Sequence, residues 1–498
     1  TKKTMNKFLK TFTLFFISIF AFTSCEIESD LYVTNPESPD DSILASDPVA
    51  LEATAQGLYR AFYMSASGYY SPGHATNTMA DTSSCSWGNF GMKDTSSEPR
   101  VAFNNSTAYG YSYITNSFFN AMYSVSTDAN LIQKAVNTPE VYAKFDNPKV
   151  VDAMSKFAQA LSMGYLALYF DKVWLSDETG AIGNVDGSTP TEALAFVTAK
   201  IDAAITAASG ITGAIPTNYT NGSITSGPQL VEVINGYGAR FVANMARNKA
   251  GRAATDWAKV KTYAAAGPKA DWMINHDDIN YYDNFKTYLV YPGWSRIDMR
   301  IINKMDSSTD AYWDATKTIY PPATSTDARL ALDYKYLSGQ NFRPERGTYH
   351  FSAYRYGRYD NYITEWTVPT VEIPVTEMHM YQAEAEAQQG NGAAAVAIIN
   401  ASSYVTRGGN AALTATTVSA AMAAIHYERQ VEMPVASAGL SFFEMRGLDL
   451  LQPGTLLHFP IPGAALIAIQ PPLTPVDNYT YGGTSGVAGQ DYSNGGWR

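Results

Sequence analysis

Apolar residues recur every three or four positions over much of the chain, and this spacing predicts a mainly α-helical protein. The first helix is expected to begin near Pro48, where residues 49–62 place their apolar side chains on approximately one face. Further helices are expected at residues 113–135, 150–170, 190–208, 233–248, 255–266, 376–389, 393–402 and 420–434. Thr189 followed by Pro190 is a typical helix start, because Thr caps the free amide groups and Pro fits the first turn.

Two parts of the chain predict a helix–turn–helix arrangement. Residues 233–248 and 255–266 flank Gly251, and residues 376–389 and 393–402 flank a Gly-Asn-Gly turn. Small residues such as Ala383, Ala385 and Ala387 permit the close approach that paired helices need. We therefore expect tetratricopeptide-like helix pairs forming a scaffold, although the full repeat signature is absent.

Two stretches interrupt this periodicity, residues 65–112 and 268–372, and both are rich in aromatic side chains. We expect long irregular loops there. A segment of about 100 residues without regular structure inside a compact protein is usually functional. After the helix at 420–434, the Pro- and Gly-rich sequence predicts coil to Arg498.

The first 24 residues have the layout of a bacterial lipoprotein export signal. Lys7 and Lys10 precede an apolar run at residues 14–22, which is too short to span a bilayer. Small residues then lead to Cys25, as in a lipobox, and the acidic residues 26–30 resemble a surface-export signal. We expect cleavage before Cys25, lipidation of that residue, a polar tether over residues 25–48 and a single folded domain over residues 49–498.

Composition and charge exclude several protein classes. Of the 498 residues, 46% are hydrophobic and 16% charged, so the chain can bury a sizeable core and is not disordered. The formal charge of −11, with no dense Lys/Arg run beyond the first ten residues, argues against nucleic acid as a partner. The 34 Tyr residues suit partly exposed recognition surfaces, because Tyr has an apolar face and a polar tip.

Sequence signatures of catalysis are weak. The zinc-protease helix, the phosphate-binding loop and the nucleophile elbow are all absent. Beyond Cys25 the only cysteine is Cys85, and neither His74 nor any neighbour is evident as its activating base. His276-Asp277-Asp278 is more typical of a loop corner than of a metal site. We expect no catalytic residue, cofactor or metal, while the pair of carboxylates of a glycoside hydrolase has no sequence spacing that would exclude it.

The aromatic loops carry the candidate ligand site. Sugar rings have an apolar C–H face that packs on an aromatic plane and a hydroxyl rim that hydrogen-bonds polar side chains. In residues 81–91, Trp87 lies among small residues near Asn89, although the same pattern fits a loop whose Trp packs onto the body. The candidate stacking residues are Trp87, Tyr291, Trp294 and Trp313, and the candidate rim hydrogen-bonding residues are Asn89 and Asp81.

Several motifs together resemble the SusD/RagB nutrient-binding lipoproteins of the Bacteroidetes outer membrane. The chain is similar to that family in its lipobox, the Gly-Leu-Tyr of residues 57–59, the Ala-rich helix 158–170 followed by Asp171–Leu175, and Ile201–Ile205. Further similarities are Glu377–Ala385, Tyr427–Met433 and the Pro-Ile-Pro of residues 460–462. Residues 438–445 depart from the family pattern, which indicates a divergent member.

The resemblance implies a mainly α-helical fold with four tetratricopeptide-like helix pairs behind loop-built ligand sites. It also implies a surface-exposed, lipid-anchored protein of the outer membrane, held by acyl chains at Cys25, that captures oligosaccharide without catalysis. The implied partner is a SusC-like TonB-dependent β-barrel transporter. The alternatives are a peptide-binding member of the same family and, third, a glycoside hydrolase.

Overall fold

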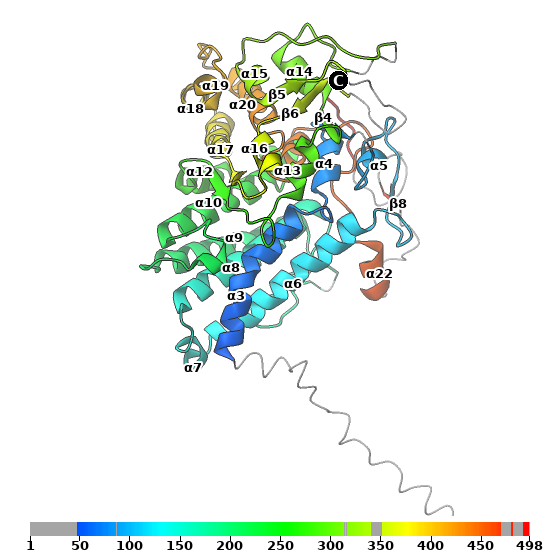
Figure 1. Cartoon of the computed structure of the whole chain (residues 1–498). Coiled ribbons are helices and arrows are strands. Elements are labelled where there is room, and N and C mark those ends of the chain that lie inside the picture. The colour runs from blue at the N-terminus through cyan, green and yellow to red at the C-terminus, as the bar shows by residue number, and fades with distance from the viewer. Residues whose placement is uncertain are drawn as a thin grey trace, which may run out of the picture.

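The computed structural model describes residues 47–85, 87–184, 186–312, 314, 316–339, 351–469, 480–481 and 492–497. The predicted export signal, Cys25 and the tether as far as residue 46 lie outside these residues, as does Trp313. Within the described part the chain is mainly helical, as the periodicity predicts (Figure 1).

The longer helices are α3 (Pro48–Ala66), α6 (Tyr113–Val136), α8 (Pro148–Tyr169), α9 (Pro190–Ser209), α10 (Gly227–Asn244), α12 (Trp257–Ala266), α17 (Val375–Gln388), α18 (Gly392–Ala401) and α20 (Val418–Glu432). Each of the predicted helices is present. Thr189 caps α9 in a full capping box with Glu192. The helix predicted from residue 233 is longer: α10 begins at Gly227, because the Ser226 side chain accepts a hydrogen bond from the Gln229 amide and Pro228 occupies the first turn.

The long helices pack in sequence order into a curved array. Antiparallel neighbours α6 and α8, α8 and α9, and α9 and α10 are in contact, and the array continues through α12, α17, α18 and α20 (Figure 1). Small residues permit this packing. A Cβ on Gly164 of α8 would lie 2.5 Å from the ring of Phe241 in α10, so any larger residue there would separate the two helices.

Most of the short elements lie in the other half of the molecule, at the top and right of Figure 1, whereas α7 lies at the bottom near the start of α3. The short helices are α4 (Gly73–Met79), α5 (Met92–Ser96), α7 (Pro139–Tyr142), α11 (Lys249–Ala253), α13 (Asn284–Val290), α14 (Met299–Met305), α15 (Arg329–Asp333), α16 (Asp360–Thr364), α19 (Ser403–Thr406), α21 (Leu440–Gly447) and α22 (Gly463–Ile469), with a 3₁₀ turn at Thr217–Tyr219. The strands are β1 (Ser83–Cys85), β2 (Phe103–Asn104), β3 (Trp272–Ile274), β4 (Ser295–Ile297), β5 (Tyr334–Tyr336), β6 (Tyr354–Tyr356), β7 (Thr370–Ile373) and β8 (Thr480–Tyr481).

These short elements correct two predictions. Residues 65–112 and 268–372 are not free of regular structure, because the strands pair antiparallel as β1–β4, β2–β8, β3–β7 and β5–β6. The coil predicted after residue 434 is also wrong, since it contains α21 and α22. Elements of two to eight residues are shorter than the windows in which hydrophobic periodicity can be recognised.

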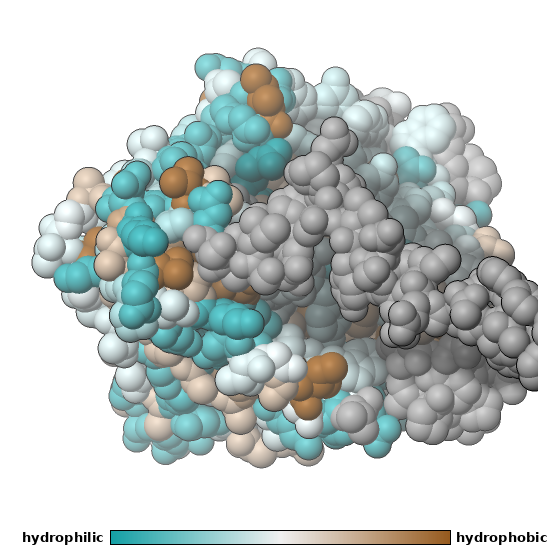
Figure 2. Space-filling model, turned by 90° about the horizontal axis from the view of Figure 1, so that it is seen from below, coloured by the Kyte–Doolittle hydropathy of each residue, from teal (hydrophilic) through white to brown (hydrophobic). Residues whose placement is uncertain are grey.

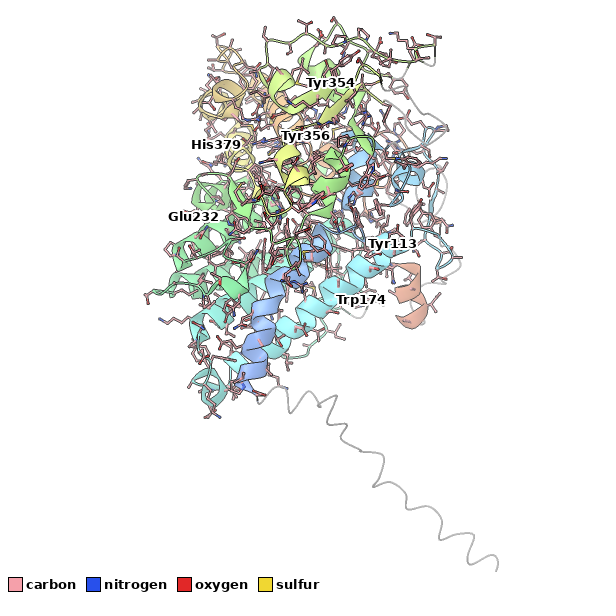
Figure 3. The ribbon with its side chains drawn as sticks, viewed as in Figure 1. Tyr113, Trp174, Glu232, Tyr354, Tyr356 and His379 are labelled. Carbon is pink, nitrogen blue, oxygen red and sulfur yellow. The ribbon has the colours of Figure 1, made fainter. Side chains whose placement is uncertain are left out.

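Most of the central tyrosines are core residues rather than surface ones, which overturns the reading of Tyr abundance as a recognition surface. Tyr334, Tyr354, Tyr356 and Tyr362 are all buried and belong to a hydrophobic cluster of the loop half. Figure 3 shows Tyr354 and Tyr356 in this upper part of the molecule, while His379 and Glu232 mark the helical array. A larger cluster fills the space between α3, α6, α8, α9 and α10.

Buried ion pairs connect α17 to the neighbouring helices α10, α11 and α20. Arg240 of α10 contacts both Glu372 and Glu377, at 2.9 and 2.8 Å, and Glu384 of α17 contacts Arg252 and Arg429. Burial alone would destabilise these charges, so each requires its partners. Glu377, Glu384 and Arg429 lie in two of the motifs that resemble the SusD/RagB pattern, which shows that these motif residues serve the architecture of this chain.

The face seen from below carries its apolar residues as separate patches among hydrophilic ones, where the described atoms are visible (Figure 2). None of the helices in the described part of the chain combines the length and apolar character of a membrane span.

The Arg240 ion pairs give a stability prediction. Arg240→Met leaves two carboxylates buried without their cation, so we expect a loss of about 3–5 kcal/mol in the free energy of unfolding, measured by chemical denaturation. The matched control is Lys259→Met, which removes a more exposed pair with Asp202 and should cost at most about 1 kcal/mol. Equal losses in the two variants would contradict a structural role for the buried pairs.

Candidate ligand-binding site

One short strand pair brings together two aromatic segments that are about 200 residues apart in the sequence. Strand β1 pairs antiparallel with β4, and Cys85 lies opposite Ser295 at the end of the ladder. Trp87 follows β1 by two residues and Trp294 immediately precedes β4. Because antiparallel partners run in opposite directions, the residues after β1 and before β4 emerge at the same end of the pair.

The loop after β1 has an unusual backbone. Gly88, Phe90 and Gly91 all have positive φ, at 76°, 55° and 71°. Glycine tolerates this conformation, whereas Phe90 is strained by about 1–2 kcal/mol. Its ring stacks on Tyr69 at 4.9 Å with an interplanar angle of 9°, a contact that offsets the strain. The turn leaves the Trp87 side chain 54% exposed.

The segment before β4 places its aromatic residues at every third position. Tyr288 lies in α13, Tyr291 ends that helix, and the Trp294 amide donates to the Tyr291 carbonyl at 3.2 Å. The Trp294 ring lies 5.3 Å from Tyr288 and 4.7 Å from Tyr291. The start of α13 is held by Asp283, which caps the helix and forms a buried ion pair with Lys286 at 2.6 Å.

The two segments and Tyr69 together line an open hollow of about 390 Å³. Its walls are aromatic except for one carboxamide, and the lining residues are Tyr69, Trp87, Asn89, Phe90, Tyr288 and Trp294. The Asn89 side-chain amide donates to the Tyr288 hydroxyl at 3.3 Å, which aims the carboxamide along the wall. None of these described lining residues carries a charge at neutral pH.

His74 of α4 forms the base beneath these rings. Its imidazole is fully buried, lies 5.0 Å from the ring of Phe90 and 5.7 Å from that of Tyr288, and Nε2 lies 3.3 Å from the Asn284 carbonyl. Burial lowers the pKa of His74 to about 4, against the opposing effects of the Asn284 carbonyl and Asp283. Burial also raises the pKa of Tyr288. The hollow therefore stays uncharged across the neutral range.

The structure brings four of the predicted site residues together. Trp87, Asn89 and Trp294 line the hollow, and Tyr291 lies against Trp294 with 37% of its surface exposed. Trp313 lies outside the described residues.

Asp81 does not face the hollow, contrary to the expectation for a rim residue. It is buried, its carboxylate contacts Arg100 at 3.1 Å, and the Trp497 indole N–H donates to it at 2.6 Å. Asp81 therefore serves the architecture, and we leave it out of the site.

Three lining residues, Tyr69, Phe90 and Tyr288, were not among the sequence candidates. Phe90 lies between Asn89 and Gly91, so the Gly-Asn-Phe-Gly turn was the available signal. Tyr69 and Tyr288 had no signal of their own, since neither sequence neighbourhood differs from the many tyrosines that the core buries.

The structure also shows the surroundings of two other reactive groups, the Cys85 thiol and the Asp277 carboxylate. Cys85 is buried, and burial raises the pKa of its thiol to about 11, so the thiolate nucleophile is not formed at neutral pH. Asp277 accepts hydrogen bonds from the amides of Ile279, Asn280 and Tyr281, as a loop corner does. The described residues contain no group of three His, Cys, Asp or Glu side chains arranged to hold a metal ion.

Solved structures share this architecture. The chain aligns over 82% of its length with 88% of a SusD-like protein from Bacteroides fragilis, at a TM-score of 0.59 and 12% identity. It aligns over 79% of its length with 87% of surface glycan-binding protein A from Bacteroides uniformis, at a TM-score of 0.54 and 13% identity. A SusD-like carbohydrate-binding protein from Bacteroides fragilis matches 81% of the chain over 86% of its own, at a TM-score of 0.51 and 14% identity.

No protein-family model matches the sequence, and no curated protein matches it either. The structural matches nevertheless show that the chain has the SusD-like fold, which confirms the mainly helical fold class and, at the level of architecture, the resemblance stated from the motifs.

His74 gives a pH prediction. Because its pKa is about 4 in the folded chain and about 6.5 in an unfolded one, the unfolded chain binds the proton first as the pH falls. His74 should therefore reduce stability between about pH 6.5 and pH 4, by about 3 kcal/mol in total.

The measurement compares urea denaturation of the wild type and His74→Phe at pH 7.5 and pH 4.5. Phe preserves the apolar ring packing and cannot titrate, so this variant should lose less stability on acidification. The same loss in both proteins would show that His74 is not neutral at the base of the hollow.

Proposed function

We propose that the chain captures oligosaccharides on the cell surface at the aromatic hollow and releases them chemically unchanged. The observation that carries this proposal is the pair of tryptophans, Trp87 and Trp294, that line one open, uncharged hollow although they come from distant segments. Aromatic planes pack on the C–H faces of sugar rings, and the Asn89 carboxamide can hydrogen-bond hydroxyl groups at their rim.

The absence of charge from the described lining residues favours a neutral ligand. A short peptide presents charged termini and a row of amide groups, which require charged or backbone partners. The hollow offers ring planes and a single carboxamide instead, so we favour a glycan over a peptide. Two of the proteins with the same fold, a surface glycan-binding protein and a carbohydrate-binding protein, agree with this choice.

The lining also argues against hydrolysis at this place. Glycoside hydrolases require two carboxylates on either side of the scissile bond. The described residues that line the hollow include neither Asp nor Glu. Binding without catalysis is therefore the function we propose.

We further propose that the captured glycan passes to a SusC-like TonB-dependent β-barrel transporter in the outer membrane, and that acyl chains on Cys25 hold the protein there. The support is the sequence resemblance: a lipobox at Cys25 followed by an acidic segment. Several acyl chains anchor a protein stably, whereas one chain does so marginally.

Replacing the two tryptophans tests the hollow. Trp87→Ala and Trp294→Ala should each weaken binding of the glycan found in a panel of neutral oligosaccharides and short peptides by about tenfold or more, equal to about 1.4 kcal/mol. Calorimetry measures the affinity, and circular dichroism shows that the fold is retained. The matched control is Trp174→Ala, because Trp174 is half-buried against the main core and does not line the hollow.

Three outcomes would count against the proposal. They are full affinity in both single variants and the double variant, a peptide as the sole ligand, or release of shortened glycan products by the purified wild type.

A further inference from the structure

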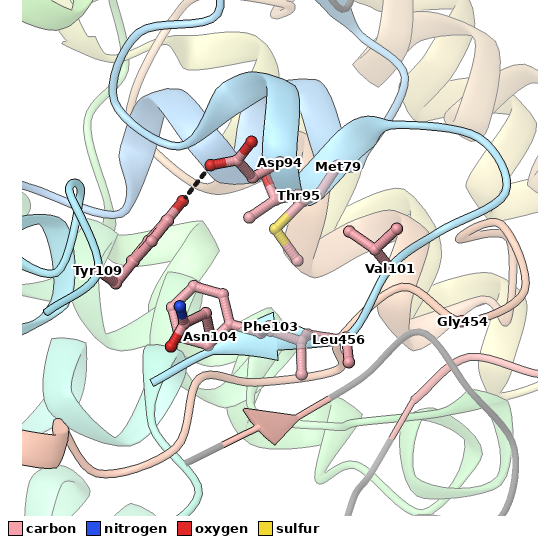
Figure 4. Close-up of a pocket in the computed structure, with 10 residues that line it drawn as sticks. Met79, Asp94, Thr95, Val101, Phe103, Asn104, Tyr109, Gly454 and Leu456 are labelled. Atoms are coloured by element: carbon pink, nitrogen blue, oxygen red, sulfur yellow. Dashed lines mark hydrogen bonds between the residues drawn. The ribbon is translucent and has the colours of Figure 1, made fainter. Parts of the chain in front are cut away.

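A second pocket is lined in part by Asp94 and Thr95, which follow the segment that carries Trp87. It holds about 190 Å³, and its described lining comes from α4, α5, the strand β2 and the segment around Leu456. Figure 4 shows Met79, Val101, Phe103 and Leu456 around the pocket, with the hydrogen-bonded Asp94 and Tyr109 to one side. None of the sequence candidates lies here.

Part of the lining of this pocket follows the lining of the aromatic hollow closely in the sequence. Residues 87–90 contribute Trp87, Asn89 and Phe90 to the hollow, and Asp94 and Thr95 follow within one helical turn on the pocket side. The residues between these two sets are closely packed, because a Cβ on Gly91 would lie 3.0 Å from Cδ1 of Ile114 and 3.3 Å from the Tyr109 hydroxyl. The short segment 87–95 therefore contributes side chains to both cavities.

A row of aromatic rings in mutual contact runs from Tyr70, beside Tyr69 in the sequence, to Phe103 in the pocket. Exposed Tyr70, the neighbour of Tyr69 in the hollow, meets Tyr113 edge to face at 5.1 Å. The row continues from Tyr113 to Tyr111 at 6.0 Å, from Tyr111 to Tyr109 at 5.8 Å, and from Tyr109 to Phe103 at 5.8 Å. Tyr109, Tyr111 and Tyr113 are half-buried, so this row offers partly exposed rings.

The chemistry of the pocket differs from that of the hollow. Its apolar part consists of Met79, Val101, Phe103 and Leu456, and Val101 at the rim is 55% exposed. Asp94 is the one charged residue in the described lining. The Tyr109 hydroxyl donates to its Oδ2 at 2.7 Å, which leaves further carboxylate lone pairs as acceptors for ligand hydroxyl groups.

These features select one kind of sugar unit. The apolar part accommodates a methyl group better than a hydroxymethyl group, since a buried hydroxyl without a partner is destabilising. The Asp94 carboxylate repels uronic acids and sulfated sugars. We propose that this pocket is a second sugar subsite that takes an uncharged unit bearing a methyl group, as a 6-deoxy or N-acetyl substituent, of the same glycan that occupies the hollow. The part of this inference that concerns a shared glycan rests on the proposed function.

Saturation-transfer NMR tests the pocket independently of the hollow. The probes are L-fucose and N-acetylglucosamine, compared with D-glucose, which has no methyl group, and galacturonic acid. The proteins are the wild type, the double variant Trp87→Ala/Trp294→Ala, the plugged variant Val101→Trp, and Asp94→Asn, which keeps the shape of the side chain. Ile279→Trp is the matched control, because Ile279 is 75% exposed and lines neither cavity.

We expect transfer to the methyl protons of the first two probes in the wild type, the double variant and Ile279→Trp. The signal should fall at least fivefold in Val101→Trp and in Asp94→Asn, and galacturonic acid should give none. Methyl-probe signals that survive Val101→Trp but vanish in the double variant would overturn the inference, as would their absence from the wild type.

The shared glycan is tested with the neutral oligosaccharides of the affinity panel. Val101→Trp should weaken binding of those that contain a methyl-bearing unit by about tenfold and leave the others unchanged. Equal effects on both groups would overturn a joint site. Probe binding in the pocket without any glycan bound in the hollow would instead refute the proposed function. It would still support a sugar subsite in the pocket, so the two failures are distinguishable.

Discussion

The antiparallel pairing of β1 with β4 is the constraint on which the candidate site depends. Three residue pairs, from Ser83–Ile297 to Cys85–Ser295, fix the register of two segments that are otherwise separate. The Asp298 amide extends the ladder by donating to the Thr82 carbonyl at 3.0 Å. A slip of one residue would turn every side chain of the strand to the opposite face. The positions of Trp87 and Trp294 at one end of the pair follow from this register.

The walls around that strand pair are held in place before any ligand arrives. Phe90 is fixed by its left-handed backbone and its contact with Tyr69, and Tyr288 by α13, whose first turn is capped by buried Asp283. Rigid walls reduce the conformational entropy that binding would otherwise remove. The helical array supports them from behind, with buried ion pairs such as Arg240–Glu377 connecting α10 to α17.

Sequence reasoning was most successful where the signal was long and local. The helices of fifteen residues or more were all predicted, because their apolar periodicity extends over several turns, and Thr189 was recognised as a cap from its neighbours. The candidate site was predicted in part. Trp87 and Asn89 stand out among small residues. Asp81 in the same loop is neutralised by Arg100 and accepts a hydrogen bond from Trp497, contacts that no local pattern reveals. Tyr69 and Tyr288 resemble the buried tyrosines Tyr334 and Tyr356 in sequence and differ from them only in what packs around them.

By itself, the sequence predicted a helical scaffold interrupted by two aromatic-rich segments, and it placed Trp87, Asn89 and Trp294 among the candidate ligand-binding residues. Those properties depend on periodicity and residue type, which are present in any window of the chain. The tertiary structure decided which rings are walls and which are core, that Trp87 and Trp294 share one hollow, and that Asp94 and Tyr109 line a separate pocket. These outcomes depend on the pairing of strands about 200 residues apart and on burial among distant neighbours, and a long-range contact is a property of the folded chain alone.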